Sequence, residues 1–224
     1  MSTSLPRSDR SALRRIARDP VSRRRFFAIS GGTGAAGALL AACGDDDDMS
    51  STASPSTPAD DEMASQFGEG DLGIVNYALT LEYLEAAFYA DAARSGLFKG
   101  DDQALIEQIG QAEQEHVDAL TATAKQLGGQ PAKEPKAQFP LDDAASVLEL
   151  AATVENLGAA AYLGQAANIE SPEVLAAALS IHSVEGRHAA VLNVLNGKQP
   201  TPDGAFAKPA DMQTVLDSVQ PFLA

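Results

Sequence analysis

The chain has 224 residues and a formal net charge of −15 at pH 7, and 45% of its residues are hydrophobic while only 5% are aromatic. Residues 1–42 contain eight Arg and two Asp, a net charge of +6, so residues 43–224 carry −21. An acidic domain repels phosphate, which argues against nucleic acid as a partner, and a single cysteine excludes an intramolecular disulfide.

The first 43 residues are typical of a signal peptide. A basic region is followed by an apolar run over 26–42 that is too short and too rich in glycine to span a membrane. Residues 22–27 (SRRRFF) resemble the twin-arginine export motif, and residues 40–43 (LAAC) resemble a bacterial lipobox in which Cys43 is lipidated. The alternatives are an ordinary basic region and a free or buried thiol. We predict an exported protein, lipid-anchored to the bacterial cell membrane and facing the periplasm or the cell exterior.

Residues 44–70 combine an acidic run at 45–48 with a stretch over 50–58 that is rich in Ser, Thr and Pro. Such a segment cannot bury enough apolar surface to fold. It is predicted to be a disordered tether between the lipid and the folded domain.

From Asp71 onward, four segments repeat their apolar residues in alternating steps of three and four, which marks one face of a helix. These faces run over 72–93, 106–127, 148–169 and 178–195. Abundant Ala and Leu with few β-branched or aromatic runs also favour helices. The pattern predicts an all-α bundle over 71–196.

Turn and capping residues separate these segments. Gly96, Gly100 and the pair at 128–129 are predicted to end the first two helices, Asp101 to cap the second, and Asp142 or Asp143 the third. The sequence Ser-Pro-Glu at 171–173 is typical of the start of a helix.

The connection over 129–141 contains three prolines and is much longer than the other two links. We predict that it runs the length of an antiparallel four-helix bundle as one long crossover between the second and third helices. The remaining residues, 197–224, form a tail whose pattern at 212–219 predicts a short helix lying against the bundle.

Each apolar face contains a glutamate where an apolar residue is expected, and a buried carboxylate is costly unless it is paired or binds a metal. The second and fourth segments add a histidine three residues later, on the same face of the helix. The spacing makes the chain two copies of one helical hairpin. The six residues concerned are Glu82, Glu113, His116, Glu155, Glu185 and His188.

Paired about a pseudo-two-fold axis, the two hairpins would bring together four carboxylates and two imidazoles. Four carboxylates balance the charge of two divalent cations when the histidines are neutral. Carboxylate and imidazole ligands without thiolate suit iron or manganese, although zinc remains open.

Residues 76–89 (NYALTLEYLEAAFY) resemble the first helix of the secreted, desiccation-related branch of the ferritin-like superfamily, and the resemblance extends over about residues 71–196. It implies a dinuclear iron or manganese centre in which two of the glutamates bridge the metals. By that resemblance the six residues named above are the ligands.

Other residues near the predicted centre each have two possible roles. Glu85 lies one turn from Glu82 and competes with it as a ligand, but only Glu82 repeats the seven-residue spacing to a tyrosine. These tyrosines, Tyr89 and Tyr162, either orient carboxylates by hydrogen bonds or pack in the core. His182 is expected to be a core histidine or to support the ligands.

Two adjacent redox metals can react with O₂ or peroxide, which predicts ferrous oxidation or peroxide removal in the cell envelope. The alternative is a non-catalytic, metal-stabilised module that protects against stress or desiccation. An oligomer is compatible with both, but a closed storage cage is disfavoured because each N-terminus carries a lipid.

Overall fold

The structure is a computed structural model that describes residues 66–224. The predicted signal peptide, the lipidation site Cys43 and the tether up to residue 65 lie outside the described residues. The last residues assigned to the tether pack on the bundle: the ring of Phe67 contacts Tyr77 edge to face, with 5.7 Å between centroids.

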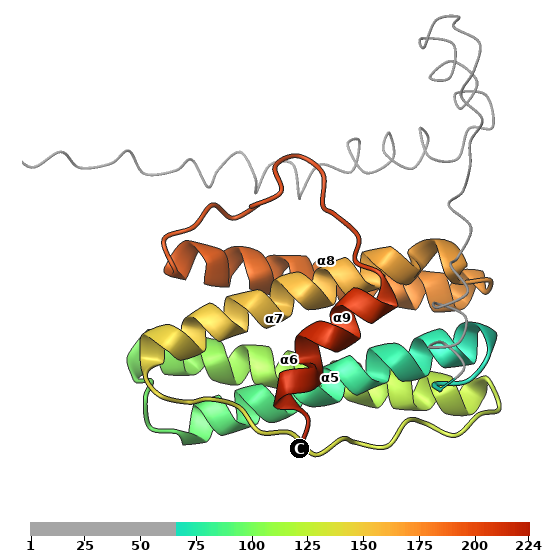
Figure 1. Ribbon diagram of the computed structural model, residues 1–224, viewed down its shortest axis with the longest axis horizontal. Helices are drawn as coiled ribbons and strands as arrows, with labels where there is room; N and C mark the ends of the chain where they lie inside the picture. Colours follow the sequence, from blue (N-terminus) through green and yellow to red (C-terminus); the bar gives the residue numbers. More distant parts are fainter. Residues whose placement is uncertain (1–65) are drawn as a thin grey trace, which may run out of the picture. The chain divides into compact units, whose positions relative to one another are not determined.

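The described residues form an all-helical fold (Figure 1). Four long helices pack as two hairpins, α5 with α6 and α7 with α8. A short helix, α9, follows in the tail, and the described residues contain no β-strand beyond one isolated bridge. The predicted all-α, four-helix architecture is therefore confirmed. The helices are α5 Gly70–Arg94, α6 Gly100–Gln126, α7 Ala144–Gln165, α8 Pro172–Leu195 and α9 Met212–Val219.

The helix starts follow local capping chemistry. Asp143 caps α7 by accepting hydrogen bonds from the backbone N–H groups of Ala145 and Ser146, and Ser171 caps α8, whose first residue is Pro172. The prediction for Asp101 is wrong: the N-cap of α6 is Lys99, two residues earlier, and its side chain forms no capping hydrogen bond. Asp101 lies instead in the first turn, where its charge still favours the positive end of the helix dipole.

The connection between α6 and α7 runs along the length of the bundle, as predicted (Figure 1). The C-terminal tail holds it in place: the backbone N–H of Gln138 donates to the carbonyl of Phe222, at 2.9 Å. Next to this bond, the ring of Phe139 packs between those of Phe88 and Phe222. The tail therefore lies against the bundle, and α9 covers the side formed by α5 and α7.

Asn76 on α5 ties the start of the crossover to the helix. Its side-chain nitrogen donates to the carbonyls of Phe67 and Gln130, and its oxygen accepts from the backbone N–H of Ala132 at 2.8 Å. This amide is buried, so removing it leaves three backbone groups without their partner.

We expect Asn76→Ala to lower the free energy of unfolding by about 2–3 kcal/mol. Urea unfolding checks this, with Gln111→Ala as a control because Gln111 is exposed on α6. Equal losses in the two variants would contradict a role for Asn76 in anchoring the crossover.

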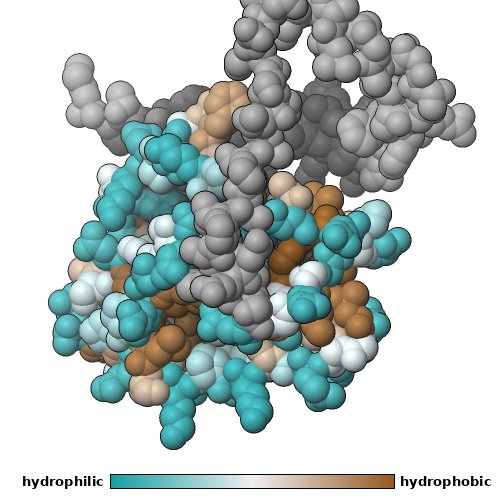
Figure 2. Space-filling view, turned by 45° about the vertical axis from the view of Figure 1, so that its right-hand side comes forward, coloured by the Kyte–Doolittle hydropathy of each residue, from teal (hydrophilic) through white to brown (hydrophobic). Residues whose placement is uncertain are grey.

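The visible face of the described part is mostly hydrophilic, with small groups of hydrophobic residues between the polar ones (Figure 2). None of the helices between residues 66 and 224 combines the length and apolar character needed to cross a membrane.

Candidate metal centre

The four glutamates predicted from the sequence lie inside the bundle, one on each long helix, and all are 0% exposed. Two apolar clusters flank them along the helix axes. On α5, for example, Glu82 follows Leu79 of one cluster and precedes Phe88 of the other. The centre is thus closed by apolar side chains towards both ends of the bundle.

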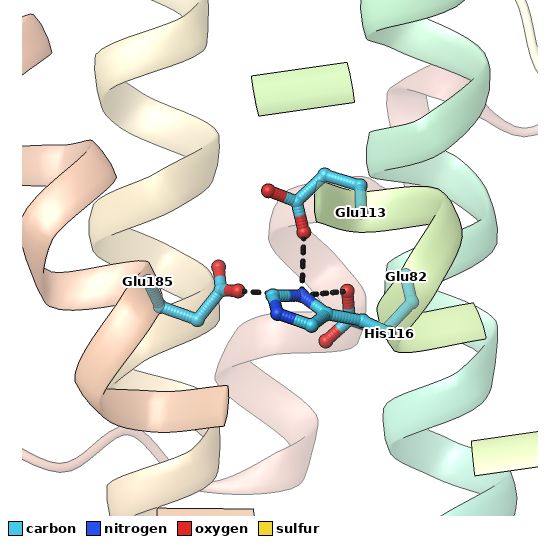
Figure 3. Close-up of side chains that lie close together, drawn as sticks. All are labelled: Glu82, Glu113, His116 and Glu185. Carbon is cyan, nitrogen blue, oxygen red and sulfur yellow. Dashed lines mark hydrogen bonds and ion pairs between the residues drawn. The ribbon is translucent and has the colours of Figure 1, made fainter. Parts of the chain in front are cut away.

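Half of the centre surrounds the imidazole of His116 (Figure 3). Its Nδ1 lies 2.9 Å from Glu113 Oε2 and 3.2 Å from both Glu82 Oε2 and Glu185 Oε1. These side chains come from α5, α6 and α8 and offer four ligand atoms that lie within 4.8 Å of one another.

The other half surrounds His188 on α8. Its Nδ1 lies 2.9 Å from Glu113 Oε1 and 3.3 Å from Glu155 Oε2. Together with Glu185 these residues make a second group of four whose ligand atoms lie within 4.8 Å of one another. Glu113 and Glu185 belong to both groups, so the structure brings together all six residues singled out from the sequence.

Several polar atoms of the centre face a common space without a hydrogen-bond partner among the described residues. They are Glu113 Oε1, Glu155 Oε2, both oxygens of Glu185 and His188 Nδ1. His188 Nδ1 is close enough to Glu113 and Glu155 for a hydrogen bond, yet neither contact has the required direction. Buried groups that converge without bonding one another suit cations placed between them, so the donor set fits two metal ions.

Two tyrosines link the hairpins by reciprocal hydrogen bonds. The hydroxyl of Tyr162 on α7 donates to Glu82 Oε1 at 2.5 Å, and that of Tyr89 on α5 donates to Glu155 Oε1 at 2.6 Å. Each bond occupies one carboxylate oxygen and leaves Oε2 directed at the neighbouring histidine. The tyrosines therefore orient carboxylates, which was one of the two roles open from the sequence.

We expect Tyr162→Phe to keep the fold but to weaken metal binding by about 10–100-fold, because Glu82 loses the group that orients it. Competition with a chelator of known affinity measures this. Tyr83→Phe is a matched control, since among the described residues Tyr83 makes no hydrogen bond to the centre. Equal affinity in both variants would contradict the orienting role.

Glu85 is the carboxylate that competed with Glu82 as a predicted ligand. It is 3% exposed, and it lies beside the centre without belonging to either group of four. Gly158 on α7 makes room for it, because a methyl group added at Gly158 would lie 2.8 Å from Glu85 Oε1. His182 lies outside both groups, and its Nδ1 donates to the carbonyl of Ala159.

The histidines hold protons in the metal-free centre. Burial alone would lower the pKa of His116, but the close carboxylates of Glu113, Glu185 and Glu82 outweigh it and raise the pKa to about 12. The same opposition at His188, with Glu113 and Glu155 as partners, raises its pKa to about 9. Both imidazoles are therefore cationic at neutral pH and compensate buried carboxylates.

The carboxylates divide into two classes. Burial raises the pKa of Glu82 to about 7, despite its hydrogen bond with His116, and burial also raises the pKa of Glu155 and of Glu185. At Glu113 the effect of burial is outweighed by His116 and His188, which lower its pKa to about 2. Glu113 is thus the carboxylate that stays ionised throughout.

These shifts predict that the metal-free bundle loses stability as pH rises from about 5 to 9. The carboxylates with raised pKa values and both histidines bind more protons in the folded than in the unfolded chain, so unfolding is favoured when protons become scarce. Melting temperatures of chelator-treated protein at pH 5.5, 7 and 9 test this. A melting temperature that rises over this range would contradict it.

The centre is shielded unequally on its two sides. On the α5 and α7 side, α9 adds Met212, Val215 and Val219 to a third apolar cluster. The side chains nearest solvent are those of His116 and His188, which are 11% and 15% exposed and lie on α6 and α8. Solutes therefore reach the centre most directly past the histidines.

Comparison with known proteins agrees with this architecture. Residues 70–198 match the family model described as "Ferritin-like domain". The structure is similar to the crystal structure of a conserved hypothetical protein, rv2844, from Mycobacterium tuberculosis, at 20% identity and a TM-score of 0.51, over 57% of this chain and 90% of that one. No curated protein matches the sequence. The family match covers more than half of the chain and includes all six residues of the centre, so the protein belongs to the ferritin-like domain family.

Proposed function

We propose that the protein is an exported, lipid-anchored ferritin-like protein whose six converging side chains bind two iron or manganese ions for redox chemistry in the cell envelope. The observation that carries this proposal is the set of buried carboxylate and imidazole atoms that face one another without hydrogen-bond partners. In the metal-free centre, protons on the two histidines offset part of the buried negative charge. Cations placed between the helices can replace these protons, and the donor types suit iron or manganese.

The glutamates and the histidines would bind the two ions in different ways. Glu113 presents one oxygen to each half of the centre, so it is placed to bridge two ions, and Glu185 belongs to both halves. Binding through Nδ1 of His116 and His188 requires the protons held there to leave. Metal binding should therefore release protons, and the affinity for metal should increase as pH rises.

When bound, the two ions would each supply one electron, and the two electrons with two protons reduce one hydrogen peroxide to two waters. The apolar clusters above and below the carboxylates exclude bulk water from the reaction. Tyr162 and Tyr89 keep Glu82 and Glu155 in place by holding one oxygen of each. The chain thus contributes orientation, charge and a dry environment.

Anaerobic loading with Fe(II), followed by peroxide or O₂, tests this function. We expect two Fe(II) bound per chain, and two Fe(II) oxidised for each peroxide consumed. Failure to consume either oxidant at full metal occupancy would end the enzymatic interpretation.

A second function is favoured by the burial of the centre. Because the four glutamates are 0% exposed, the same ions could serve only to hold the helices together, as in a stress- or desiccation-protection module. Bound metal that stabilises the fold without reacting with oxidant would support this function over the redox one.

Export and anchoring rest on the N-terminal motifs alone. We expect Cys43→Ser to release the protein from the membrane fraction, and replacement of Arg23 and Arg24 by Lys to retain it in the cytoplasm. Unchanged fractionation of both variants would contradict the proposed export and lipid anchoring.

A further inference from the structure

Glu85 is a buried carboxylate that the six-residue centre does not use. It is 3% exposed, and its Oε2 has no hydrogen-bond partner among the described residues. Burial is the main reason that its pKa is raised well above the usual range, followed by the charges of Glu185, Glu82, Glu113 and Glu155. The negative groups that act on Glu85 are thus the carboxylates of the centre.

Gly158 shows where this carboxylate points. A methyl group added to Gly158 would lie 2.8 Å from Glu85 Oε1 and 3.0 Å from Glu185 Oε2. Both oxygens therefore lie against the same point on α7, so Glu85 is directed at the side of the centre where Glu185 sits. Any side chain larger than hydrogen at position 158 would compete for the space that Glu85 occupies.

The position of Glu85 departs from the pseudo-two-fold symmetry of the centre, because the two hairpins carry different residues there. Glu82 and Glu155 are equivalent, since each accepts a hydrogen bond from the tyrosine of the other's helix. Three residues further along α5 is Glu85, and three residues further along α7 is Gly158. One repeat supplies a carboxylate and the other supplies the space for it.

We propose that Glu85 is a fifth carboxylate ligand of the centre, which binds when the total charge of the two ions exceeds +4. This inference rests on the proposed metal centre. Four carboxylates with two neutral imidazoles balance two divalent ions. If the bound pair lost one electron, the total charge would become +5, and a fifth buried carboxylate beside the centre would stabilise that charge strongly in a medium of low dielectric constant.

A redox titration of the iron-loaded chain tests this role. Glu85→Gln keeps the shape of the side chain and removes its charge. We expect the Glu85→Gln variant to stabilise the oxidised metal pair about tenfold less than the wild type, or weaker still. A tenfold change corresponds to a rise of about 60 mV in the midpoint potential of the variant. Binding of two Fe(II) per chain should persist. Glu115→Gln is the matched control, because Glu115 is exposed on α6.

The double variant Glu85→Ala with Gly158→Glu moves the carboxylate to the pseudo-symmetric position. We expect it to bring the midpoint potential back towards that of the wild type, while Glu85→Ala alone behaves like Glu85→Gln. Glu85→Ala also replaces Glu85→Gln if the latter does not fold.

The outcomes separate this inference from the proposed function. If the wild type binds two Fe(II) and loss of the Glu85 carboxylate leaves the potential unchanged, Glu85 is no ligand. It then only borders the small cavity of about 20 Å³ that it shares with Leu81, Leu84, Val215 and Val219, which is large enough for one water. If the wild type binds no metal, the proposed function itself fails.

Discussion

Removing the metal ions should lower the melting temperature by on the order of 10 °C at pH 8. Ligand binding to the folded state contributes about 4 kcal/mol at a concentration 1,000 times the dissociation constant, and a domain of this size shifts by about 2–4 °C per kcal/mol. The structural reason is that four fully buried glutamates face one another across the bundle and lose the cations between them.

Calorimetry of the metal-loaded protein with and without chelator measures this effect. The difference should shrink at pH 5.5, because protons then take the place of the metal on the histidines and on the carboxylates with raised pKa values. An unchanged melting temperature after complete metal removal at pH 8 would show that the centre does not depend on cations.

Glu113→Gln should abolish the centre rather than weaken it. Glu113 is the one carboxylate whose two oxygens lie 2.9 Å from the two histidines, and it is the one that stays ionised in the metal-free protein. An amide supplies one oxygen and no charge, so both ions lose a ligand at once. We expect affinity for both ions to fall by more than the roughly 100-fold known for groups that only orient ligands.

The matched control is Glu115→Gln, two residues along the same helix, where the side chain is exposed. Metal content by elemental analysis and helicity by circular dichroism should both be normal in the control. A folded Glu113→Gln variant that retains two ions would contradict the bridging position assigned to this residue.

Most of the fold follows from the spacing of apolar residues. Steps of three and four place one face of each helix inside, and the three prolines of the crossover prevent a continuous helix from α6 to α7. The start of α6 could not be placed as well. There, Lys99 takes the extended backbone conformation of an N-cap although its side chain offers no acceptor, so the usual sequence signal is missing.

The centre was predictable because helical spacing determines which side chains share an inner face. The pattern placed Glu82, Glu113, Glu155 and Glu185 at equivalent positions, and the structure brings them together. The exchange of tyrosine hydrogen bonds between the hairpins depends instead on how α5 crosses α7, which the spacing does not contain.

Glu85 shows the limit of sequence reasoning most clearly. Glu82 and Glu85 lie three residues apart on one face of α5, and both turn out to be buried. The signal that distinguishes them is the glycine on the facing helix, and pairing Glu85 with Gly158 requires the antiparallel alignment of α5 with α7. The repeat of the two hairpins is visible in the sequence, so the glycine at position 158, equivalent to Glu85, was the one available sequence signal.

The position of bound metal is tested most directly by anomalous X-ray scattering from crystals grown with Mn(II). Two peaks about 3.5–4 Å apart are expected between the four long helices. Each should contact Glu113 and Glu185, one beside His116 and Glu82 and the other beside His188 and Glu155. Metal bound only to exposed acidic residues, with no peak among these six side chains, would contradict a two-metal centre in this bundle.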